Sequence, residues 1–382
     1  MAVFLPIIFF QILAGQTDTA CRLQISLLTC TPGDELYSSW GHSALRVKNA
    51  MTGSDIIYNY GTFDFDDPAF YSKFTRGKLL YFVSQDDFED FVKEYEYEKR
   101  GITEQVLNLS CEEKQQLSTA LQENAREENK YYKYDFMYDN CTTRLRDMVF
   151  KNAGSPVETK NILPFSRVSF RNLIHEYLNR THQYWSKLGI DILLGMPLDK
   201  KLSNSESMFL PDYLLKGFDS TTVHATALVK EKKEILKAGL PENSAPFFSP
   251  MTIFISLFLI IMILGVWRQM DRFLNAFDFF FFFFCGMLGV FLVFMWFGTD
   301  HPECKNNLNL AWAFPFHFVL AFFIYRRWNW LKYYFLFNAF LLLLLLLSWR
   351  WLPQEMNNAL LPLICLLLFR SFARYRKLNH HA

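Results

Sequence analysis

Two short stretches of this sequence combine residue types that could carry out nucleophilic catalysis. His42 follows a glycine at the start of the segment HSALRV, and Cys141 lies in the string YDFMYDNCTTRLRD. A thiol at a helix N-terminus gains from the free backbone N–H groups and the helix dipole, both of which favour the thiolate. A histidine within reach could take the thiol proton and later return it to a leaving group. The pair therefore predicts catalysis with Cys141 as the nucleophile and His42 as the base.

A third polar group is needed to hold the imidazole in one tautomer. Asn59 is the candidate, because it lies on the adjacent strand-like segment DIIYNYG, and Asp64 is the runner-up. Tyr58, Tyr60 and Ser39 could line the pocket, and packing explains these three residues equally well.

Spacing alone leaves other thiols and imidazoles open for both roles, because a lone cysteine is most often a small buried hydrophobe. Cys111 is the weaker alternative, since a capping box of Ser110 and Glu113 explains its surroundings. The full set of alternatives is Cys30 and Cys111 for the thiol, and His175, His182 and His224 for the base.

The seven cysteines include no CxxC pair and no regular spacing, so neither a zinc site nor a dense disulfide framework is predicted. Some of the first four could pair in an oxidising compartment, with Cys141 staying free. No metal or other cofactor is expected.

The elements that would position these residues can be predicted from local patterns. HSALRV and DIIYNYG alternate as strands do, the second of them ending in a glycine turn at Gly61. Helices are expected after the capping box at Ser110 and at DNCTTRLRDMVF, with Asp139 or Asn140 as the N-cap.

Composition divides the chain into two units. A length of 382 residues is too great for one small domain and suggests two structural units. The net charge of +1 gives no support for a nucleic-acid partner. Aromatic residues make up 18%, with 41 Phe, a load that a soluble domain rarely buries. We expect an exported α+β domain over residues 21–247 and a transmembrane domain over residues 248–373, with a cytoplasmic tail at 374–382.

The apolar segments predict how the chain meets the membrane. Residues 1–20 begin with a short apolar run, typical of a signal peptide, and an uncleaved anchor is the alternative. Five later stretches approach the length that crosses about 30 Å of hydrocarbon. They cover residues 249–267, 274–297, 308–325, 331–349 and 357–372.

Arginine and lysine gather after the first, third and fifth stretches, which marks that side as cytoplasmic. The catalytic domain then lies on the periplasmic side of the inner membrane, and the C-terminus is cytoplasmic.

Ionisable groups in the apolar half are functional hypotheses by default. Asp278 lies close to the cytoplasmic end and could snorkel, and His317 follows Pro315, which could kink its span. The outer loop Asp300-His301-Pro302-Glu303-Cys304 has no metal-ligand spacing and is better explained as a lid or lipid gate.

Longer strings carry a resemblance. The sequence resembles the exported domain of the bacteroidetal lipoprotein N-acyltransferase family in the strings CTPGDELYSSWGHSALRV, YNYGTFDF, FTRGKLLYFV and YDFMYDNCTTRLRD. It resembles the same family in the later strings LLGMPLDK and MFLPDYL, and in GTDHPECKNNLNLAWAFP between the second and third apolar stretches. That family is similar to circularly permuted NlpC/P60 proteins, papain-like folds in which the catalytic His precedes the Cys. The resemblance implies such a fold for the α+β domain and supports the pair of His42 and Cys141. Its third catalytic position does not transfer cleanly, so Asn59 and Asp64 both stay open.

The resemblance also implies an activity. Cys141 would take an acyl chain from a membrane phospholipid as a thioester and pass it to the α-amino group of a diacylglyceryl lipoprotein. Five helices suit substrates that are confined to the bilayer. The alternatives are a cell-wall cysteine peptidase or amidase of NlpC/P60 type, which a single span would anchor, and a non-enzymatic membrane scaffold.

Overall fold

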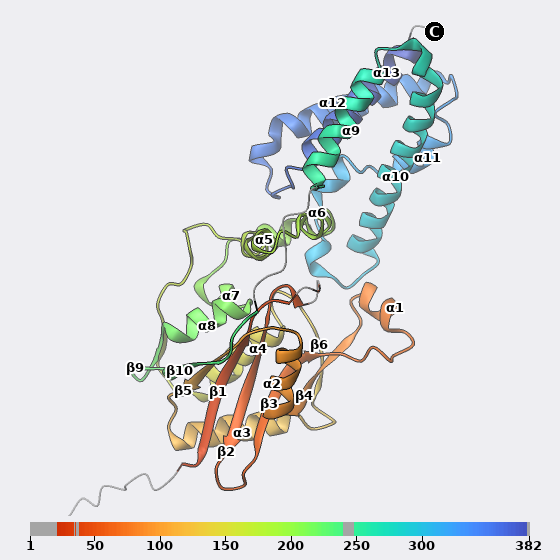
Figure 1. The fold of residues 1–382 in the computed structure, drawn as a ribbon. Helices are drawn as coiled ribbons and strands as arrows, with labels where there is room; N and C mark the ends of the chain where they lie inside the picture. Colours follow the sequence, from red (N-terminus) through yellow and green to blue (C-terminus); the bar gives the residue numbers. More distant parts are fainter. Residues whose placement is uncertain (1–20, 34, 36–37, 240–247, 380–382) are drawn as a thin grey trace, which may run out of the picture.

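A computed structural model describes residues 21–379, apart from residues 34, 36–37 and 240–247. It contains a mixed α/β part, called here the sheet domain, followed by a helical bundle formed by α9 to α13 (Figure 1). The expectation of an α+β domain followed by an all-helical one is therefore confirmed at this level. The predicted signal segment, residues 1–20, lies outside the described residues.

The centre of the sheet domain is a seven-stranded antiparallel sheet in the order β10-β5-β1-β2-β3-β4-β6. The predicted strands HSALRV and DIIYNYG are confirmed as β2 and β3, which are neighbours. The strands are β1 (Leu23–Cys30), β2 (His42–Asn49), β3 (Asp55–Thr62), β4 (Leu80–Asp87), β5 (Ile102–Leu107), β6 (Tyr131–Lys133) and β10 (Val229–Leu236).

Helices cover both faces of this sheet, because its strands bury side chains alternately on each side. Leu28, Ala44 and Ile57 pack under α2 (Phe88–Tyr97). Their strand neighbours, among them Leu27 and Leu45, pack under α3 (Cys111–Asn124) and α4 (Cys141–Asn152). The predicted capping box starts α3. A short helix, α1 (Phe70–Thr75), lies in the connection from β3 to β4.

A second group of elements follows in the chain, and its helices α5 (Phe170–Arg180) and α6 (Tyr184–Leu193) lie between the sheet and the bundle (Figure 1). Its own apolar core includes Phe170, Tyr177, Phe209 and Tyr213. The elements are α5 (Phe170–Arg180), α6 (Tyr184–Leu193), the 3-10 turn η2 (Met196–Asp199), α7 (Asn204–Ser207), α8 (Pro211–Asp219) and the small sheet of β7 (Val157–Thr159), β8 (Thr221–Val223) and β9 (Thr226–Ala227).

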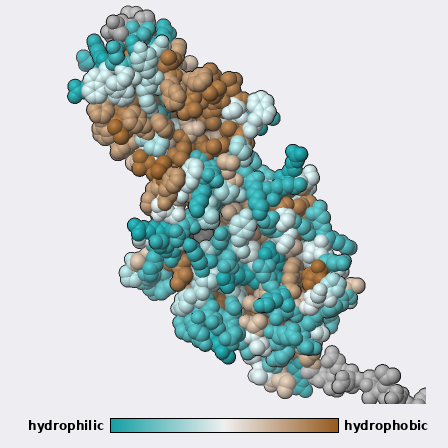
Figure 2. Space-filling model, turned by 180° about the vertical axis from the view of Figure 1, so that it is seen from behind, coloured by the Kyte–Doolittle hydropathy of each residue, from teal (hydrophilic) through white to brown (hydrophobic). Residues whose placement is uncertain are grey.

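The bundle contains α9 (Pro250–Leu264), α10 (Asp271–Phe297), α11 (Phe316–Ala321), α12 (Asn329–Ser348) and α13 (Leu360–Asn379), with 3-10 turns η3 (Arg268–Met270), η4 (Pro302–Cys304), η5 (Leu308–Ala311) and η6 (Trp349–Trp351). Within the described ranges, two stretches are long and apolar enough to cross a membrane, Asp271–Phe297 and Asn329–Trp351, and α9 is a shorter apolar helix. The number of crossings stays a prediction. Figure 2 shows hydrophobic colour gathered over the bundle and hydrophilic colour over the sheet domain.

The apolar stretch over residues 308–325, in which Pro315 is expected to kink the span, is not one continuous helix. That stretch consists of η5, a turn at Pro315 and the short α11. Asn309 explains the break at its start, since its side-chain amide donates to the backbone carbonyls of Asp191 and Ile192 in α6. Proline has no N–H to continue a helix through residue 315. α13, in contrast, continues to Asn379, past the tail boundary expected at residue 374.

A disulfide between Cys21 and Cys111 joins the segment before β1 to the first residue of α3. It confirms that cysteines among the first four pair, and it removes Cys111 as a candidate nucleophile. Cys141 is free, as expected.

Candidate active site

Cys141 is the first residue of α4, and the side chain of Asn140 sets its position. Oδ1 of Asn140 accepts hydrogen bonds at 2.9 Å from each of the two backbone N–H groups that follow Cys141. Its Nδ2 donates at 2.8 Å to the backbone carbonyls of Phe136 and Phe209. Asn140, and not Asp139, is thus the N-cap. It holds the thiol at the positive end of the helix dipole.

His42 is the first residue of β2, and Gly41 makes its approach possible. Gly41 has a φ of +81°, and a Cβ there would lie 2.5 Å from the carbonyl oxygen of Cys30. Only glycine fits this close turn without strain. The turn brings His42 opposite Cys30 in the antiparallel register, at the end of the sheet where β3 also ends.

Asn59 contacts the imidazole directly. Its Oδ1 lies 3.1 Å from Nε2 of His42, which leaves Nδ1 as the nitrogen for the thiol. Its Nδ2 donates to Oδ2 of Asp86 at 2.6 Å, and Ser84 donates to the same oxygen at 3.2 Å. The Asn59 side chain is therefore held in place by Asp86, and it can in turn fix the tautomer of the His42 imidazole.

Asp86 was not identified from the sequence. It belongs to β4, and its place beside Asn59 depends on the register of β3 with β4, in which Asn59 faces Ser84. The available signal was the polar run Ser84-Gln85-Asp86-Asp87 inside a strand that is otherwise aromatic and apolar.

The thiol and the imidazole are hydrogen-bonded to each other, and each changes the pKa of the other. Burial alone would raise the pKa of Cys141, but the hydrogen bond and charge of His42 outweigh it, so the pKa lies below the usual thiol value. Burial alone would lower the pKa of His42, and the Cys141 contact instead raises it. Both shifts favour a thiolate–imidazolium pair. Both side chains remain partly exposed, so a substrate can reach them.

The alternative nucleophile Cys30 lies close by but in a different environment. It is fully buried beneath α2, and this burial raises its pKa to about 12. A thiol with that pKa stays protonated at neutral pH and is a poor nucleophile.

The three alternative bases are engaged elsewhere. Nε2 of His175 contacts Asp191 at 2.7 Å, Nδ1 of His182 contacts the Tyr184 hydroxyl at 3.0 Å, and Nε2 of His224 contacts Glu113 at 3.3 Å.

The remaining sequence candidates do not touch the imidazole. Asp64 is exposed, and its carboxylate accepts from the backbone N–H of Asp66. Tyr58 and Tyr60 belong to the core beneath α3 and α4, as their packing explanation predicts. Ser39 is fully buried and contacts the Gln183 side chain at 3.2 Å. That contact ties the turn before His42 to the start of α6.

The first turn of α4 also offers a site for an oxyanion. Asn140 occupies the N–H groups of Thr142 and Thr143, so the amide of Cys141 is the free first-turn donor in the described part of the chain. Beside it, Gly61 has a φ of +90°, and a Cβ there would meet Cβ of Cys141 at 3.6 Å. An N–H at a helix start next to a nucleophile can stabilise the oxyanion of an acyl-transfer intermediate.

A series of contacting aromatic rings runs from the Cys141 thiol to α1. Tyr134, beside Cys141, stacks on Tyr81 with ring centroids 4.3 Å apart. Tyr81 contacts Phe63 at 5.4 Å, and Phe63 contacts Phe70 at 5.7 Å. The series ends in α1 and its flanks, where Phe65, Tyr71 and Phe74 are largely exposed.

The loop after α10 docks against this aromatic segment. The Asp300 N–H donates to the carbonyl of Arg76, and Nε2 of His301 contacts the carbonyl of Phe74 at 3.0 Å. Lys133 forms an ion pair with Asp300 at 3.1 Å. No group of three or more side chains suited to a metal occurs in the described ranges. Whether the loop acts as a lid stays a prediction.

The ionisable groups of the bundle are buried. Asp278 does not snorkel: it is fully buried and forms ion pairs with Arg370 and Arg374. His317 is also fully buried, with Nδ1 bonded to the Tyr334 hydroxyl and with no partner for Nε2 in the described part of the chain.

Comparison with known proteins identifies both parts of the chain. Residues 14–179 match the Lnb N-terminal periplasmic domain, and residues 242–381 match the Lnb transmembrane domain. No curated protein and no solved structure matches the chain. The two family models together cover most of the sequence, with a periplasmic domain followed by a membrane domain. The chain therefore belongs to the Lnb family of membrane proteins.

Proposed function

We propose that this chain is a thiol-dependent N-acyltransferase that completes the acylation of bacterial lipoproteins at the outer face of the inner membrane. The observation that carries the proposal is the hydrogen-bonded array of Cys141, His42 and Asn59 at the end of the sheet. The Lnb match supports lipoprotein processing as the context. We place the bundle in the membrane as five crossing segments, the third of them the broken stretch over residues 308–325, with the C-terminus in the cytoplasm.

The first half-reaction transfers an acyl chain to the enzyme. The Cys141 thiolate attacks an ester carbonyl of a phospholipid, and the oxyanion is held at the Cys141 amide. Collapse breaks the ester C–O bond, and the His42 imidazolium gives its proton to the departing alkoxide of the lysophospholipid. The acyl chain is left as a thioester on Cys141.

The second half-reaction transfers the chain to the lipoprotein. The α-amino group of the diacylglyceryl-modified N-terminal cysteine attacks the thioester while neutral His42 accepts its proton. Collapse expels the Cys141 thiolate and leaves an amide, which restores the thiolate–imidazolium pair. No metal or other cofactor takes part.

The surroundings of the thiol support lipid substrates. The aromatic series from Tyr134 to Phe74 gives an acyl chain an apolar surface that leads from Cys141 to the loop after α10. Exposed aromatic rings at that level are typical of a membrane boundary. A cell-wall peptide would need a polar cleft instead.

Mass spectrometry of the N-terminal lipopeptide of a lipoprotein tests the proposal in cells carrying wild type, Cys141→Ala or His42→Ala. We expect the α-amino group to be unacylated in both variants while the protein still accumulates in the membrane. An unchanged lipopeptide mass in both variants would overturn the proposal, and cell-wall fragments would become the next place to look for a product.

A further inference from the structure

A pocket of about 300 Å³ lies at the junction between the sheet domain and the bundle. One wall comes from α5 and α6, and the other comes from the start of α9 and the loop between η6 and α13. The lining includes His175, Asn179, Tyr184, Lys187, Asp191, Ser249, Pro250, Met251 and residues 355–359. Two apolar helices begin at or near this pocket, so it lies where headgroups meet protein at a membrane surface.

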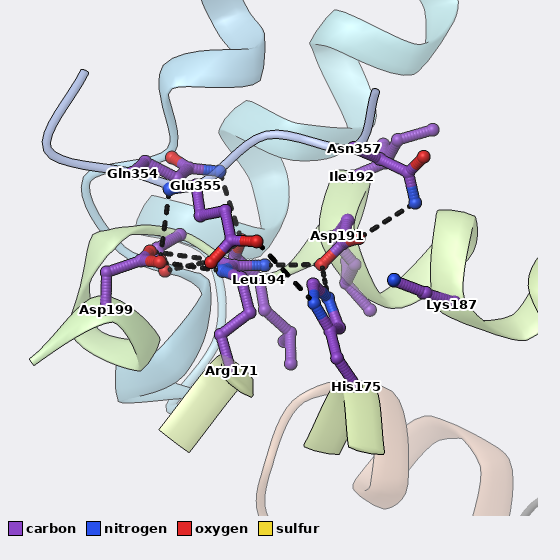
Figure 3. A network of polar contacts seen from close by, with 12 residues as sticks. Arg171, His175, Lys187, Asp191, Ile192, Leu194, Asp199, Gln354, Glu355 and Asn357 are labelled. Atoms are coloured by element: carbon purple, nitrogen blue, oxygen red, sulfur yellow. Dashed lines mark hydrogen bonds and ion pairs between the residues drawn. The ribbon is translucent and has the colours of Figure 1, made fainter. Parts of the chain in front are cut away.

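The charged groups around the pocket are mostly paired with one another (Figure 3). Arg171 is fully buried and forms ion pairs with Asp191 and Asp199, at 2.8 and 2.9 Å. Asp191 also accepts from His175 and from the Asn357 amide. This network satisfies both carboxylates, so neither has a charge left for a ligand.

Two opposite charges remain facing the pocket. Lys187 is half-buried, donates to Asn179 at 3.1 Å and makes no ion pair with any residue that the structure describes. Figure 3 shows its side chain reaching toward Asp191 and His175. On the opposite wall, the Glu355 carboxylate is about half exposed, accepts a hydrogen bond from Nδ2 of Asn172 at 2.9 Å and lies 3.9 Å from Nδ1 of His175. A half-buried lysine without an anion is an unused site for one.

We propose that this pocket binds the headgroup of a zwitterionic phospholipid, with the phosphate at Lys187 and the ammonium group at Glu355. Neutral donors and acceptors from Asn179, Ser249 and Asn358 complete a polar lining, and Pro250, Met251 and Met356 give an apolar exit toward the bundle for the chains. Because each end of the headgroup meets the opposite charge, the pocket distinguishes a zwitterion from a purely anionic lipid.

The pocket is connected to the candidate active site but distinct from it. Tyr184 lines the pocket, and the residue before it, Gln183, contacts Ser39 in the turn that leads to His42. Binding can be measured without turnover, so this inference does not rest on the acyl-transfer proposal.

Native mass spectrometry of the full-length chain in detergent tests the pocket. The probes are phosphatidylethanolamine, phosphatidylglycerol and diacylglycerol with identical acyl chains, and inorganic phosphate as competitor. We expect phosphatidylethanolamine to bind most tightly and diacylglycerol least. Lys187→Met should weaken both phospholipids about tenfold, the usual size of one lost charge-assisted hydrogen bond. Glu355→Gln should weaken phosphatidylethanolamine alone.

Controls separate the pocket from general effects. Lys187→Arg should retain binding, which shows that charge and not folding is responsible. Lys305→Met removes an exposed lysine of the loop after α10 and should change nothing. Equal binding by wild type and Lys187→Met, or equal binding of diacylglycerol, would overturn the inference. Displacement of the lipid by inorganic phosphate would show that the pocket binds a free anion, and it would overturn the assignment of a phospholipid headgroup.

The two proposals fail separately. Cys141→Ala should bind phosphatidylethanolamine like wild type, whatever its lipopeptide result. An unchanged lipopeptide with Lys187-dependent binding would remove the acyl-transfer proposal and leave the pocket standing.

Discussion

At the scale of single residues, the chemistry of Cys141 depends on what balances its burial. Burial raises the pKa of both thiols near the sheet end, but only Cys141 has a hydrogen-bonded imidazole that reverses the effect. Two cysteines that are close in space are therefore expected to differ strongly in reactivity.

Alkylation rates measured against pH test this difference. Cys141 should react with iodoacetamide at a pH below that of an ordinary thiol, while Cys30 should stay unreactive at neutral pH. His42→Ala removes the favourable charge and leaves the burial, so the Cys141 profile should move to higher pH. A profile that stays in place would show that His42 does not lower the thiol pKa.

Orientation of the imidazole is a separate contribution. Asn59→Ala removes the bond to Nε2 of His42 and should lower the acylation rate by up to about a hundredfold, the cost of misplacing a catalytic group by roughly an ångström. Asp86→Ala affects the imidazole indirectly, through Asn59, and should lower the rate less. Asp64→Ala is the matched control, because that carboxylate contacts neither residue. The measurements are the pKa of the Cys141 thiol and the lipopeptide mass. An Asp64 variant that acylates as slowly as the Asn59 variant would contradict the expected ranking of the three variants.

At the scale of elements, α3 and α4 provide a natural comparison, since each begins with a side-chain cap. Asn140→Ala removes an N-cap worth about 1 kcal/mol, and it leaves without this donor the buried carbonyl of Phe209, at a cost of roughly 1–3 kcal/mol, and the partly buried carbonyl of Phe136. Ser110→Ala removes only the exposed cap of α3. Hydrogen exchange should rise in the first turn of the affected helix in both variants.

Only the α4 variant should lose acyl transfer, because only α4 carries the thiol. Asn140→Asp keeps the oxygen that caps α4 and loses the two hydrogen bonds donated to the carbonyls of Phe136 and Phe209. This variant therefore separates the effect of the helix cap from the effect of those two bonds. Equal activity of the Ala variants would mean that the α4 cap does not position Cys141.

The elements that sequence reasoning predicted correctly are those with local signals. β2, β3 and the caps of α3 and α4 each follow from patterns within a few residues. Three features could not be found in this way: the role of Asp86, the choice of Cys111 as the disulfide partner of Cys21, and the break at Asn309, which precedes the kink expected at Pro315. Asp86 depends on strand register, the disulfide on tertiary packing, and the break on Asn309 bonding to α6.

At the scale of the molecule, two strings that lie outside the candidate active site, LLGMPLDK and GTDHPECKNNLNLAWAFP, meet at the junction. Gly195, from LLGMPLDK, donates its N–H to the carbonyl of Glu303, and a Cβ there would lie against the Lys305 carbonyl. Asn307 donates to the carbonyls of Ile192 and Leu193. A glycine and buried amides are needed here because backbone from the two parts comes into direct contact. The sequence shows these residues but not that they form one interface.

Arg171 is the centre of that interface, and its removal is the sharpest test of coupling between the two parts. Its ion pairs hold Asp191 and Asp199, which in turn accept from Asn357 and from the backbone N–H of Glu355 in the loop before α13. Breaking a buried ion pair costs about 3–5 kcal/mol, because the remaining charge is left unpaired.

Arg171→Met should therefore raise hydrogen exchange in residues 352–359 while the sheet and α4 stay protected, and it should slow acyl transfer without moving the pH profile of Cys141 alkylation. Arg180→Met is the matched control on the same helix: its ion pairs with Glu176 and Asp212 are about half exposed and worth at most about 1 kcal/mol. Faster exchange confined to α5 and α6, with residues 352–359 unaffected, would show that Arg171 stabilises its own helix and does not couple the sheet domain to the bundle.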